Sequence, residues 1–215
     1  MDELADRPRV PIPALWLITD RKLAARPLPD VVEECLGAGL RAVQLREKDL
    51  PVTDLMALAA PLRESTRRHG ARLLLNDRLD TALAAEADGV QRTGASLPVT
   101  TLRRLAPPPF LIGASVHSLD EAVQAETEGA DFVVFGPVYD TASKRQYGAP
   151  QGLDALRRVT AAVRRPVVAV GGIDPRRAPE VVAAGASGVA AIGAFLAAER
   201  PGDVVKAFLD ALGRA

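Results

Sequence analysis

Three long polar side chains occur at alternate positions in one short stretch of the sequence. Gln44, Arg46 and Lys48 follow an apolar run, with one residue between each pair. Alternate residues of an extended chain point to the same side, so these side chains are expected to converge. An amide and two cations suit a phosphate or carboxylate group, because arginine offers a planar fork of donors and lysine a point charge. A rim salt-bridge cluster with Glu47 and Asp49 is the alternative interpretation.

Glycines follow two later apolar runs. Gly171 and Gly172 end the first of these runs, and Ile192 with Gly193 ends the second. Glycine lets the backbone approach a ligand closely, and backbone N–H groups near the start of a helix attract anions. The pattern predicts a phosphate-binding backbone at both places. The alternative is that the glycines only allow tight turns.

Ser115 and His117 stand at the end of another apolar run. A histidine at the end of a strand is able to exchange protons with a substrate near neutral pH. The alternative is a packed or capping histidine, since Ser118 opens a predicted helix beside it, with Glu121 three residues further on. His117 is therefore a candidate proton carrier.

Asn76 and Asp77 follow the apolar run 72–75 and bring oxygen atoms suited to a divalent cation. One carboxylate is a small ligand set for Mg2+ unless substrate phosphates supply the remaining oxygens. Asp77 is alternatively the cap of the helix that contains Leu79 and Leu83. Both interpretations stay open on the residues alone.

Eight short runs rich in valine, leucine and isoleucine alternate along the chain with stretches of helical spacing. The runs are continuously apolar, which is typical of parallel strands covered by helices on both faces. We therefore predict an α/β fold, a single-domain (β/α)8 TIM barrel over residues 14–215 behind an N-terminal extension over residues 1–13. A doubly wound open sheet is the alternative. The predicted strands are 14–19, 42–45, 72–75, 89–90, 111–114, 132–135, 167–170 and 189–192.

Composition and charge argue against several classes of protein. Lys plus Arg and Asp plus Glu each number 27, with no long run of either sign, so neither a nucleic-acid arm nor a membrane-surface patch is expected. No stretch approaches about 18 uninterrupted apolar residues, and residues 1–13 lack the apolar core of a signal peptide. Cys35 is the only cysteine, which excludes a disulfide framework and a thiolate metal site and fits a cytoplasmic protein.

Six motifs together resemble the thiamine-phosphate synthase family, a group of (β/α)8 barrels, from Leu15 to about Phe208. The resemblance is specific for this superfamily because the motifs occur in the same order. They are Gln44-Leu45-Arg46-Glu47-Lys48, Asn76-Asp77, Ser115-Val116-His117-Ser118, Phe135-Gly136-Pro137-Val138, Thr141 to Lys144 with Gly152 beyond it, and Val170-Gly171-Gly172-Ile173.

The synthase branch of this family joins hydroxymethylpyrimidine diphosphate to thiazole phosphate with Mg2+ and releases diphosphate. Ser96 stands where that branch has a second Mg2+-binding aspartate, and a neutral hydroxyl there weakens Mg2+ binding. The loop from Asp140 to Lys144 also departs from the branch's Pro-Thr-x-Thr-Lys pattern. The resemblance implies that Asp77 binds Mg2+ and that the substrate is bound by Gln44, Arg46, Lys48, Asn76, Thr141, Ser143 and Lys144.

The other branch, thiazole tautomerase (TenI-like), aromatises a thiazole carboxylate phosphate by moving a proton. The stretch from Ser115 through Gly136 resembles this branch closely. The resemblance implies that His117 shuttles the proton and that no metal cofactor is required. It also implies that the substrate phosphate is held by glycines, namely Gly171, Gly172 and Gly193.

We favour the tautomerase on the sequence alone, because Ser96 removes a metal ligand while His117 is intact. The thiamine-phosphate synthase is the alternative, and Arg46, Lys48 and Asp77 support it. The tautomerase requires no cofactor, whereas the synthase requires Mg2+.

The expected partners are a small phosphorylated thiazole and, for the synthase, a pyrimidine diphosphate, with a homodimer as the protein partner considered. Nucleic acid and membrane are not expected. Two further interpretations are a binding protein that kept the phosphate pocket but lost catalysis, and a homologue that acts on a different phosphorylated sugar or indole. We expect the loop over residues 139–149 to order when ligand binds.

Overall fold

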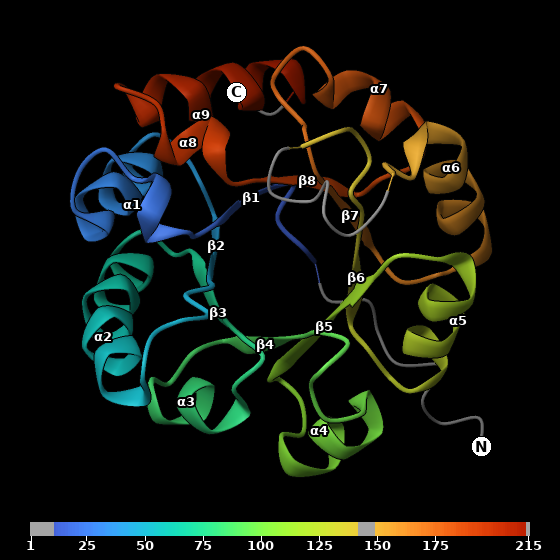
Figure 1. The fold of residues 1–215 in the computed structure, drawn as a ribbon, viewed down its shortest axis with the longest axis horizontal. Helices are drawn as coiled ribbons and strands as arrows, with labels where there is room; N and C mark the ends of the chain where they lie inside the picture. The colour runs from blue at the N-terminus through green and yellow to red at the C-terminus, as the bar shows by residue number, and fades with distance from the viewer. Residues whose placement is uncertain (1–10, 142–148, 214–215) are drawn as a thin grey trace.

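The computed structural model describes residues 11–141 and 149–213. Eight parallel strands close into a barrel in chain order, and helices surround it (Figure 1). The predicted single-domain (β/α)8 TIM barrel is therefore confirmed, and the doubly wound open sheet is wrong. Residues 142–148, which include Ser143, Lys144 and most of the loop predicted to order on ligand binding, lie outside the described residues.

The strands are short, and each is followed by a helical segment. They are β1 (Leu15–Ile18), β2 (Ala42–Leu45), β3 (Arg72–Asn76), β4 (Gly89–Arg92), β5 (Leu111–Val116), β6 (Phe132–Phe135), β7 (Val167–Val170) and β8 (Gly188–Ala191). The helices are η1 (Arg21–Leu23), α1 (Leu28–Gly37), α2 (Val52–Arg68), α3 (Leu79–Ala84), α4 (Val99–Leu105), α5 (Leu119–Thr127), α6 (Gly152–Ala162), α7 (Ala178–Ala183), α8 (Gly193–Leu196) and α9 (Pro201–Ala211). In the described part of the chain, none of these helices has the length and apolar character needed to cross a membrane.

Three strands extend further toward their C-terminal ends than the apolar runs predict. β3 ends at Asn76, β4 at Arg92 and β5 at Val116. Asn76 pairs in register with Gln91 across the β3–β4 ladder. Polar residues at the end of a strand carry no hydrophobic signal, so the sequence pattern stops too early. The extension brings Asn76, Gln91 and Ser115 into the wall of the barrel.

Alternation along the strands separates two apolar layers. One fills the barrel, where Trp16 and Phe132 meet with their ring centroids 5.1 Å apart. The other lies between the strands and the helices. Because the interior of the barrel is packed, a ligand site is confined to one of its ends. The inner layer consists of Trp16, Ile18, Ala42, Leu74, Leu111, Phe132, Val134, Val168 and Ala190.

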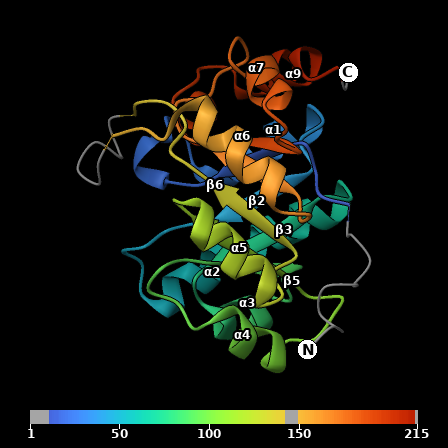
Figure 2. The same cartoon turned by 90° about the vertical axis from the view of Figure 1, so that its right-hand side faces the viewer.

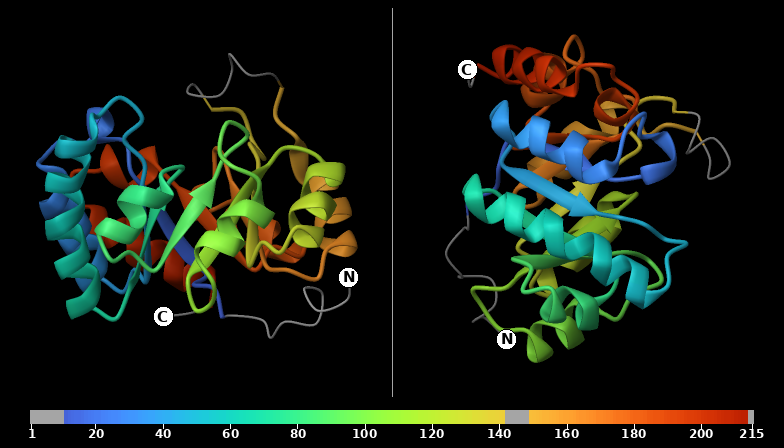
Figure 3. Two further views of the ribbon diagram at one scale, coloured as in Figure 1. Left: turned by 90° about the horizontal axis from the view of Figure 1, so that it is seen from below. Right: turned by 90° about the vertical axis from the view of Figure 1, so that its left-hand side faces the viewer.

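The two ends of the barrel carry different segments. Side views show the strands running away from the end where the described chain begins, toward the end that carries the segments after β2 and β6 (Figures 2 and 3). At the N-terminal end, Trp16 Nε1 donates a hydrogen bond to the carbonyl of Pro13 at 2.7 Å. The last residue of the predicted N-terminal extension is therefore bonded to the first strand.

The barrel closes where the first and last elements of the chain meet. β1 pairs parallel to β8, with Trp16 opposite Ala190. Outside the strands, α9 lies beside α1 (Figure 1). Glu34 Oε1 of α1 accepts the backbone N–H of Gly202 in α9 at 2.9 Å, across a sequence separation of 168 residues.

Candidate active site

Four polar side chains meet inside the C-terminal end of the barrel, where the apolar inner layer stops. Gln44 Nε2 donates to Asn76 Oδ1 at 3.0 Å, and Gln91 Nε2 donates to Ser115 Oγ at 2.9 Å. Gln44 is 4% exposed and Gln91 is 1% exposed. Their alternation with outward aliphatic residues aims all four at the barrel axis. The structure brings the predicted Gln44, Asn76 and Ser115 together and adds Gln91 to them.

Arg46 and Lys48 follow Gln44 at the rim of this opening, and Lys48 lies close enough to Arg46 and to Asp77 to interact electrostatically with both. Partial burial lowers the pKa of Lys48, the positive charge of Arg46 lowers it further, and Asp77 opposes both effects. Among the described residues, neither cation forms a salt bridge with a carboxylate. Two neighbouring cations without such a partner favour the binding of an anion from solution.

Glu47 and Asp49 do not form the alternative salt-bridge cluster with Arg46 and Lys48. Arg21 takes both carboxylates, with Nη1 at 3.1 Å from Glu47 Oε2 and 2.7 Å from Asp49 Oδ1. The alternation of the chain explains this outcome, because Glu47 points to the other side of the strand end from its neighbours. The salt-bridge interpretation of this motif is therefore wrong.

A buried hydroxyl fixes the backbone from which Arg46 projects. Thr19 Oγ1 accepts the backbone N–H of Arg46 at 2.8 Å and donates to Glu47 Oε1 at 2.7 Å. Thr19 is fully buried and Glu47 nearly so. These two bonds join the end of β1 to the end of β2, so the direction of the Arg46 side chain depends on both strands.

Asp77 does not cap the following helix. Its φ is 71°, Arg78 takes the N-cap position of α3, and no side chain caps that helix. Asp77 Oδ1 instead accepts a hydrogen bond from Ser96 Oγ, which itself accepts the backbone N–H of Thr93 at 2.7 Å. The capping interpretation is wrong because the left-handed backbone at Asp77 turns its carboxylate toward the loop after β4.

Asp77 and Ser96 are the oxygen donors that this rim offers to a divalent cation. Among the described residues, no group of three or more His, Cys, Asp or Glu side chains could hold a metal ion. A single carboxylate with a hydroxyl fits Mg2+ when substrate phosphates supply most of the remaining oxygens, since Mg2+ keeps few protein ligands in phosphate sites. The residues therefore suit Mg2+ that arrives with a phosphorylated substrate.

His117 projects from the end of β5 with one ring nitrogen fixed. Its Nδ1 lies 2.6 Å from the carbonyl of Gly136. A carbonyl oxygen only accepts, so in the neutral ring Nδ1 carries the hydrogen and Nε2 keeps its lone pair. Ser118 caps α5, and Glu121 Oε2 accepts the backbone N–H of His117 at 2.7 Å. The capping role thus belongs to Ser118, and the His117 side chain is left to act at the rim.

The glycines after β7 form a turn that other residues could not adopt. Gly171 and Gly172 have φ values of 104° and 63°. A Cβ on Gly171 would lie 2.6 Å from Pro137, and one on Gly172 would lie 2.8 Å from the carbonyl oxygen of Asp140. Tight packing and left-handed backbone therefore both require glycine here.

Backbone donors remain available at both predicted phosphate sites. The N–H groups of Gly172 and Gly193 have no acceptor within the described part of the protein. Gly193 follows Ile192, the N-cap of the short helix α8, and the first N–H groups of a helix have no intrahelical acceptor. Thr141, also predicted to bind substrate, is described at the end of the segment after β6, whereas Ser143 and Lys144 fall in the range 142–148 outside it.

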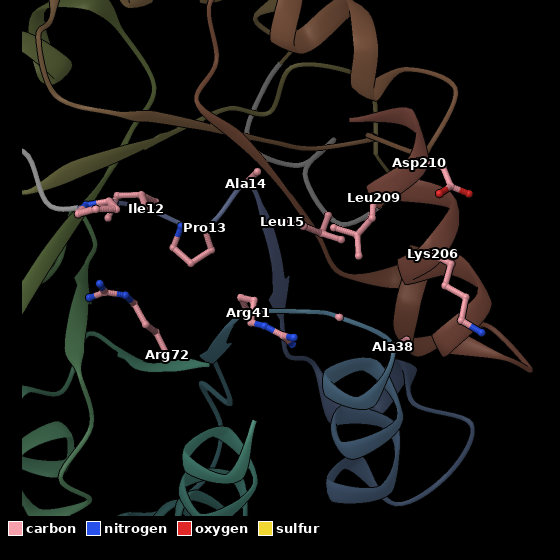
Figure 4. A pocket seen from close by; sticks show the side chains of 12 residues that line it. Ile12, Pro13, Ala14, Leu15, Ala38, Arg41, Arg72, Lys206, Leu209 and Asp210 are labelled. Atoms are coloured by element: carbon pink, nitrogen blue, oxygen red, sulfur yellow. The ribbon is translucent and has the colours of Figure 1, made fainter. Parts of the chain in front are cut away.

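A cavity of about 690 Å3 lies at the opposite, N-terminal end of the barrel (Figure 4). Its lining includes Arg41 just before β2, Arg72 at the start of β3 and Lys206 of α9, and these side chains point in different directions. Arg41 Nη1 already donates to the carbonyls of Leu36 and Leu40. None of the predicted site residues lines this cavity. The cavity is therefore separate from the polar side chains at the C-terminal end of the barrel.

Sequence reasoning missed several residues that shape the site. Gln91 was not singled out as a site residue, although Val90 beside it packs in the outer layer, so that alternation places Gln91 inside the barrel. Thr19 and Glu47 were missed as a bonded pair because they are 28 residues apart in the sequence. The contact of Arg177 with the Tyr139 ring, 4.5 Å from the guanidinium carbon to the ring centroid, also has no signal in the sequence.

Comparison with known proteins supports the resemblance found in the sequence. The sequence model described as thiamine monophosphate synthase matches residues 15–195. The thiamine-phosphate synthase of Moorella thermoacetica is 44% identical over 185 residues, which cover 86% of this chain and 88% of that protein. The thiamine-phosphate synthase of Methanoculleus marisnigri is 45% identical over 194 residues, covering 90% of each chain.

A solved structure agrees with this assignment. The thiamine phosphate pyrophosphorylase from Pyrococcus furiosus superimposes with a TM-score of 0.86 at 37% sequence identity, covering 93% of this chain and 95% of that one. Similarity at this level extends over nearly the whole barrel and includes the strand ends that carry the site. The chain therefore belongs to the thiamine monophosphate synthase family.

Proposed function

We propose that this enzyme of thiamine biosynthesis is a thiamine-phosphate synthase, which joins hydroxymethylpyrimidine diphosphate to thiazole phosphate and releases diphosphate. The names of its relatives support this alternative over the tautomerase that the sequence favoured. One observation of the site carries the proposal. Arg46 and Lys48 stand side by side at the barrel mouth and, among the described residues, neither forms a salt bridge with a carboxylate.

The reaction places its largest charge change on the leaving group. A bond from the pyrimidine methylene to the thiazole nitrogen forms as the bond from that methylene to the diphosphate oxygen breaks, and the electron pair leaves with diphosphate. Arg46 and Lys48 are placed to stabilise that developing charge. Gln44 and Asn76, bonded at 3.0 Å, offer amide groups to the uncharged pyrimidine ring in the same opening.

We extend the proposal to Mg2+ as the cofactor. Asp77 would hold it together with the Ser96 hydroxyl and oxygens of the substrate diphosphate. When bound, the ion would neutralise part of the negative charge of the diphosphate. The remaining phosphate, that of the thiazole, suits the backbone N–H groups of Gly172 and Gly193.

The tautomerase remains a second candidate function, because one observation favours it. The Gly136 carbonyl holds His117 Nδ1 at 2.6 Å, which leaves Nε2 as a proton acceptor at the rim. Displacement of diphosphate needs no such group, whereas proton transfer on a thiazole carboxylate phosphate does. Replacement of His117 by Asn should abolish that proton transfer and leave phosphate binding largely intact.

The deciding experiment mixes the purified protein with hydroxymethylpyrimidine diphosphate, thiazole phosphate and Mg2+, and reads thiamine phosphate by thiochrome fluorescence. Sustained product that disappears when Mg2+ is chelated is the expected result. No product above blank from folded protein would reject the synthase. A tautomerase assay of the wild type and His117→Asn then separates the second candidate from a binding protein without turnover.

A further inference from the structure

The turn after β7 is held from outside by two residues that were not predicted as site residues. Tyr139 follows β6, and Arg177 immediately precedes α7. The Arg177 guanidinium carbon lies 4.5 Å from the centroid of the Tyr139 ring, and Arg177 Nη1 donates to the carbonyl of Gly172 at 2.6 Å. One arginine thus contacts both the segment after β6 and the glycine turn after β7.

Further bonds fix the positions of these two residues. Tyr139 Oη donates to Glu180 Oε1 in the first turn of α7, and the backbone N–H of Arg177 donates to Asp174 Oδ1 at 3.0 Å. Burial, followed by the bond to Glu180, raises the pKa of Tyr139 to about 12, so the phenol keeps its proton under ordinary assay conditions. The Tyr139 ring also packs against the apolar core. The pair is therefore anchored at both ends.

The Tyr139 side chain packs directly on the glycine turn. A Cβ added to Gly172 would lie 2.8 Å from Tyr139 Cβ, so the bare Cα of Gly172 is what lets the two segments approach. The backbone N–H of Tyr139 donates to the carbonyl of Gly171 at 3.0 Å. Both carbonyls of the turn are thus occupied, one by the Tyr139 backbone and one by the Arg177 side chain.

The occupied carbonyls determine where the neighbouring N–H groups point. In a trans peptide the C=O and N–H groups face opposite directions. The peptides whose oxygens belong to Gly171 and Gly172 carry the N–H groups of Gly172 and Ile173. Because the oxygens accept bonds from Tyr139 and Arg177, these N–H groups point away from those two residues, and the N–H of Gly172 has no acceptor among the described residues.

We propose that Tyr139 and Arg177 are positioning residues that orient the Gly171–Gly172 turn for phosphate. The inference rests on the proposed function for its ligand, the phosphate of the thiazole substrate. Arg177 holds the turn by its hydrogen bond to the Gly172 carbonyl. Tyr139 holds the Arg177 guanidinium in place by stacking its ring against it. The same contact joins the turn after β7 to the start of the neighbouring segment after β6.

The test measures the two substrates separately in Arg177→Met. The KM for thiazole phosphate should rise about fivefold, the scale of losing one exposed cation–π contact and its hydrogen bond, while kcat stays within about twofold. The KM for the pyrimidine diphosphate should stay at the wild-type value. Calorimetry with thiazole phosphate alone should give the same fivefold loss of affinity.

Graded variants distinguish positioning from general stability. Tyr139→Leu removes the ring and should match Arg177→Met, whereas Tyr139→Phe loses only the bond to Glu180 and should stay within about twofold. Arg177→Lys keeps a donor without the planar stack and should recover part of the loss. Arg176→Met is the matched control, since the Arg176 side chain has no hydrogen bond or ion pair within the described residues.

The outcomes separate this inference from the proposed function. A wild-type protein that makes no thiamine phosphate would reject the synthase, and calorimetry of wild type and Arg177→Met with inorganic phosphate would still decide the role of the pair. Equal phosphate affinity in the two proteins, or no phosphate binding by the wild type, overturns the inference. So does an equal rise in both KM values together with a lower melting temperature, which is the signature of a merely structural role.

Discussion

The two ends of the barrel both carry cations, but they hold them differently. At the C-terminal end, Arg46 and Lys48 leave one strand end together, and a hydroxyl bonded to two strands fixes the backbone beneath them. At the N-terminal end, Arg41 and Arg72 share a cavity of about 690 Å3 but point apart (Figure 4). The difference shows that the candidate site is identified by side chains that converge and not by the volume of a cavity.

The largest effect is expected where the C-terminal end has no room for a side chain. A Cβ on Gly136 would lie 2.1 Å from the carbonyl oxygen of Val170. Gly136→Ala should lower the free energy of unfolding by about 3 kcal/mol in urea titrations, because backbone must move to admit the methyl group. Gly37→Ala, at the end of α1 with nothing within 4 Å, is the control and should change it by less than about 1 kcal/mol. Equal losses at both positions would remove this contrast.

The functional difference between the two ends is tested by replacing one arginine at each end with methionine. Arg46→Met should lower kcat/KM for the synthase reaction about 100-fold, the upper range for losing charged hydrogen bonds to a phosphate. Arg72→Met, at the other end, should keep kcat/KM within about twofold. Steady-state kinetics with both substrates measures the pair. A comparable loss at Arg72 would break the comparison.

The Thr19 hydroxyl, which bonds the backbone of Arg46, should contribute to the stability of the C-terminal end. Thr19→Val removes the hydroxyl that accepts the Arg46 N–H and donates to Glu47 Oε1. The Arg46 N–H loses its acceptor, whereas Glu47 Oε1 keeps the backbone N–H of Arg21. The free energy of unfolding should fall by about 2 kcal/mol. Thr53→Val on the exposed first turn of α2 should change it by less than about 0.5 kcal/mol. A negligible effect of Thr19→Val would mean that Arg46 is positioned without it.

Adding charge at the C-terminal end should strengthen metal binding there. Ser96→Asp places a second carboxylate beside Asp77 and should lower the Mg2+ concentration for half-maximal synthase activity on the order of tenfold. Ser96→Ala removes the hydroxyl without adding charge and should not lower it. A titration of Mg2+ at fixed substrate measures both variants. An unchanged midpoint in Ser96→Asp would place the ion elsewhere.

The smallest expected effect is a pH dependence of kcat/KM that arises from Lys48 at the C-terminal rim. The pKa of Lys48 is lowered from 10.5 by partial burial and by Arg46. In the proposed reaction its cationic form binds diphosphate, so kcat/KM should fall as the pH rises through a midpoint below 10.5. Lys48→Arg keeps its charge in this range and should remove that alkaline limb. A limb that persists in Lys48→Arg belongs to another group.

The fold was predictable because each of its signals is local. Continuous apolar runs and helical spacing identify the eight strands and their connecting helices. The ends of β3, β4 and β5 were not predictable in this way. Their residues Asn76, Gln91 and Ser115 are polar and become buried only by pairing across strands. The strand ends that the pattern missed therefore carry three of the four side chains of the site's central layer.

The functional residues also divide into those that a local sequence pattern identifies and those that depend on contacts between distant segments. Gln44, Arg46, Lys48 and Asn76 were found because alternation on one strand and position after a strand are local patterns. The bonds of Thr19 to Glu47 and of Arg177 to Gly172 depend on tertiary contact, which spacing does not encode. The names of the relatives favour the synthase over the branch that Ser96 favoured. Ser96 is compatible with a synthase, since Mg2+ in phosphate sites draws most of its oxygens from substrate and water.

The seam between β1 and β8 has a consequence for synthesis of the chain. β1 and α1 leave the ribosome well before their partners β8 and α9, and Glu34 is synthesised 168 residues before Gly202, whose N–H it accepts. Until then one side of β1 is an unpaired strand edge of the kind that other chains can join. A nascent chain stalled before α9 would expose that edge, so premature termination should yield aggregates in place of a shorter working barrel.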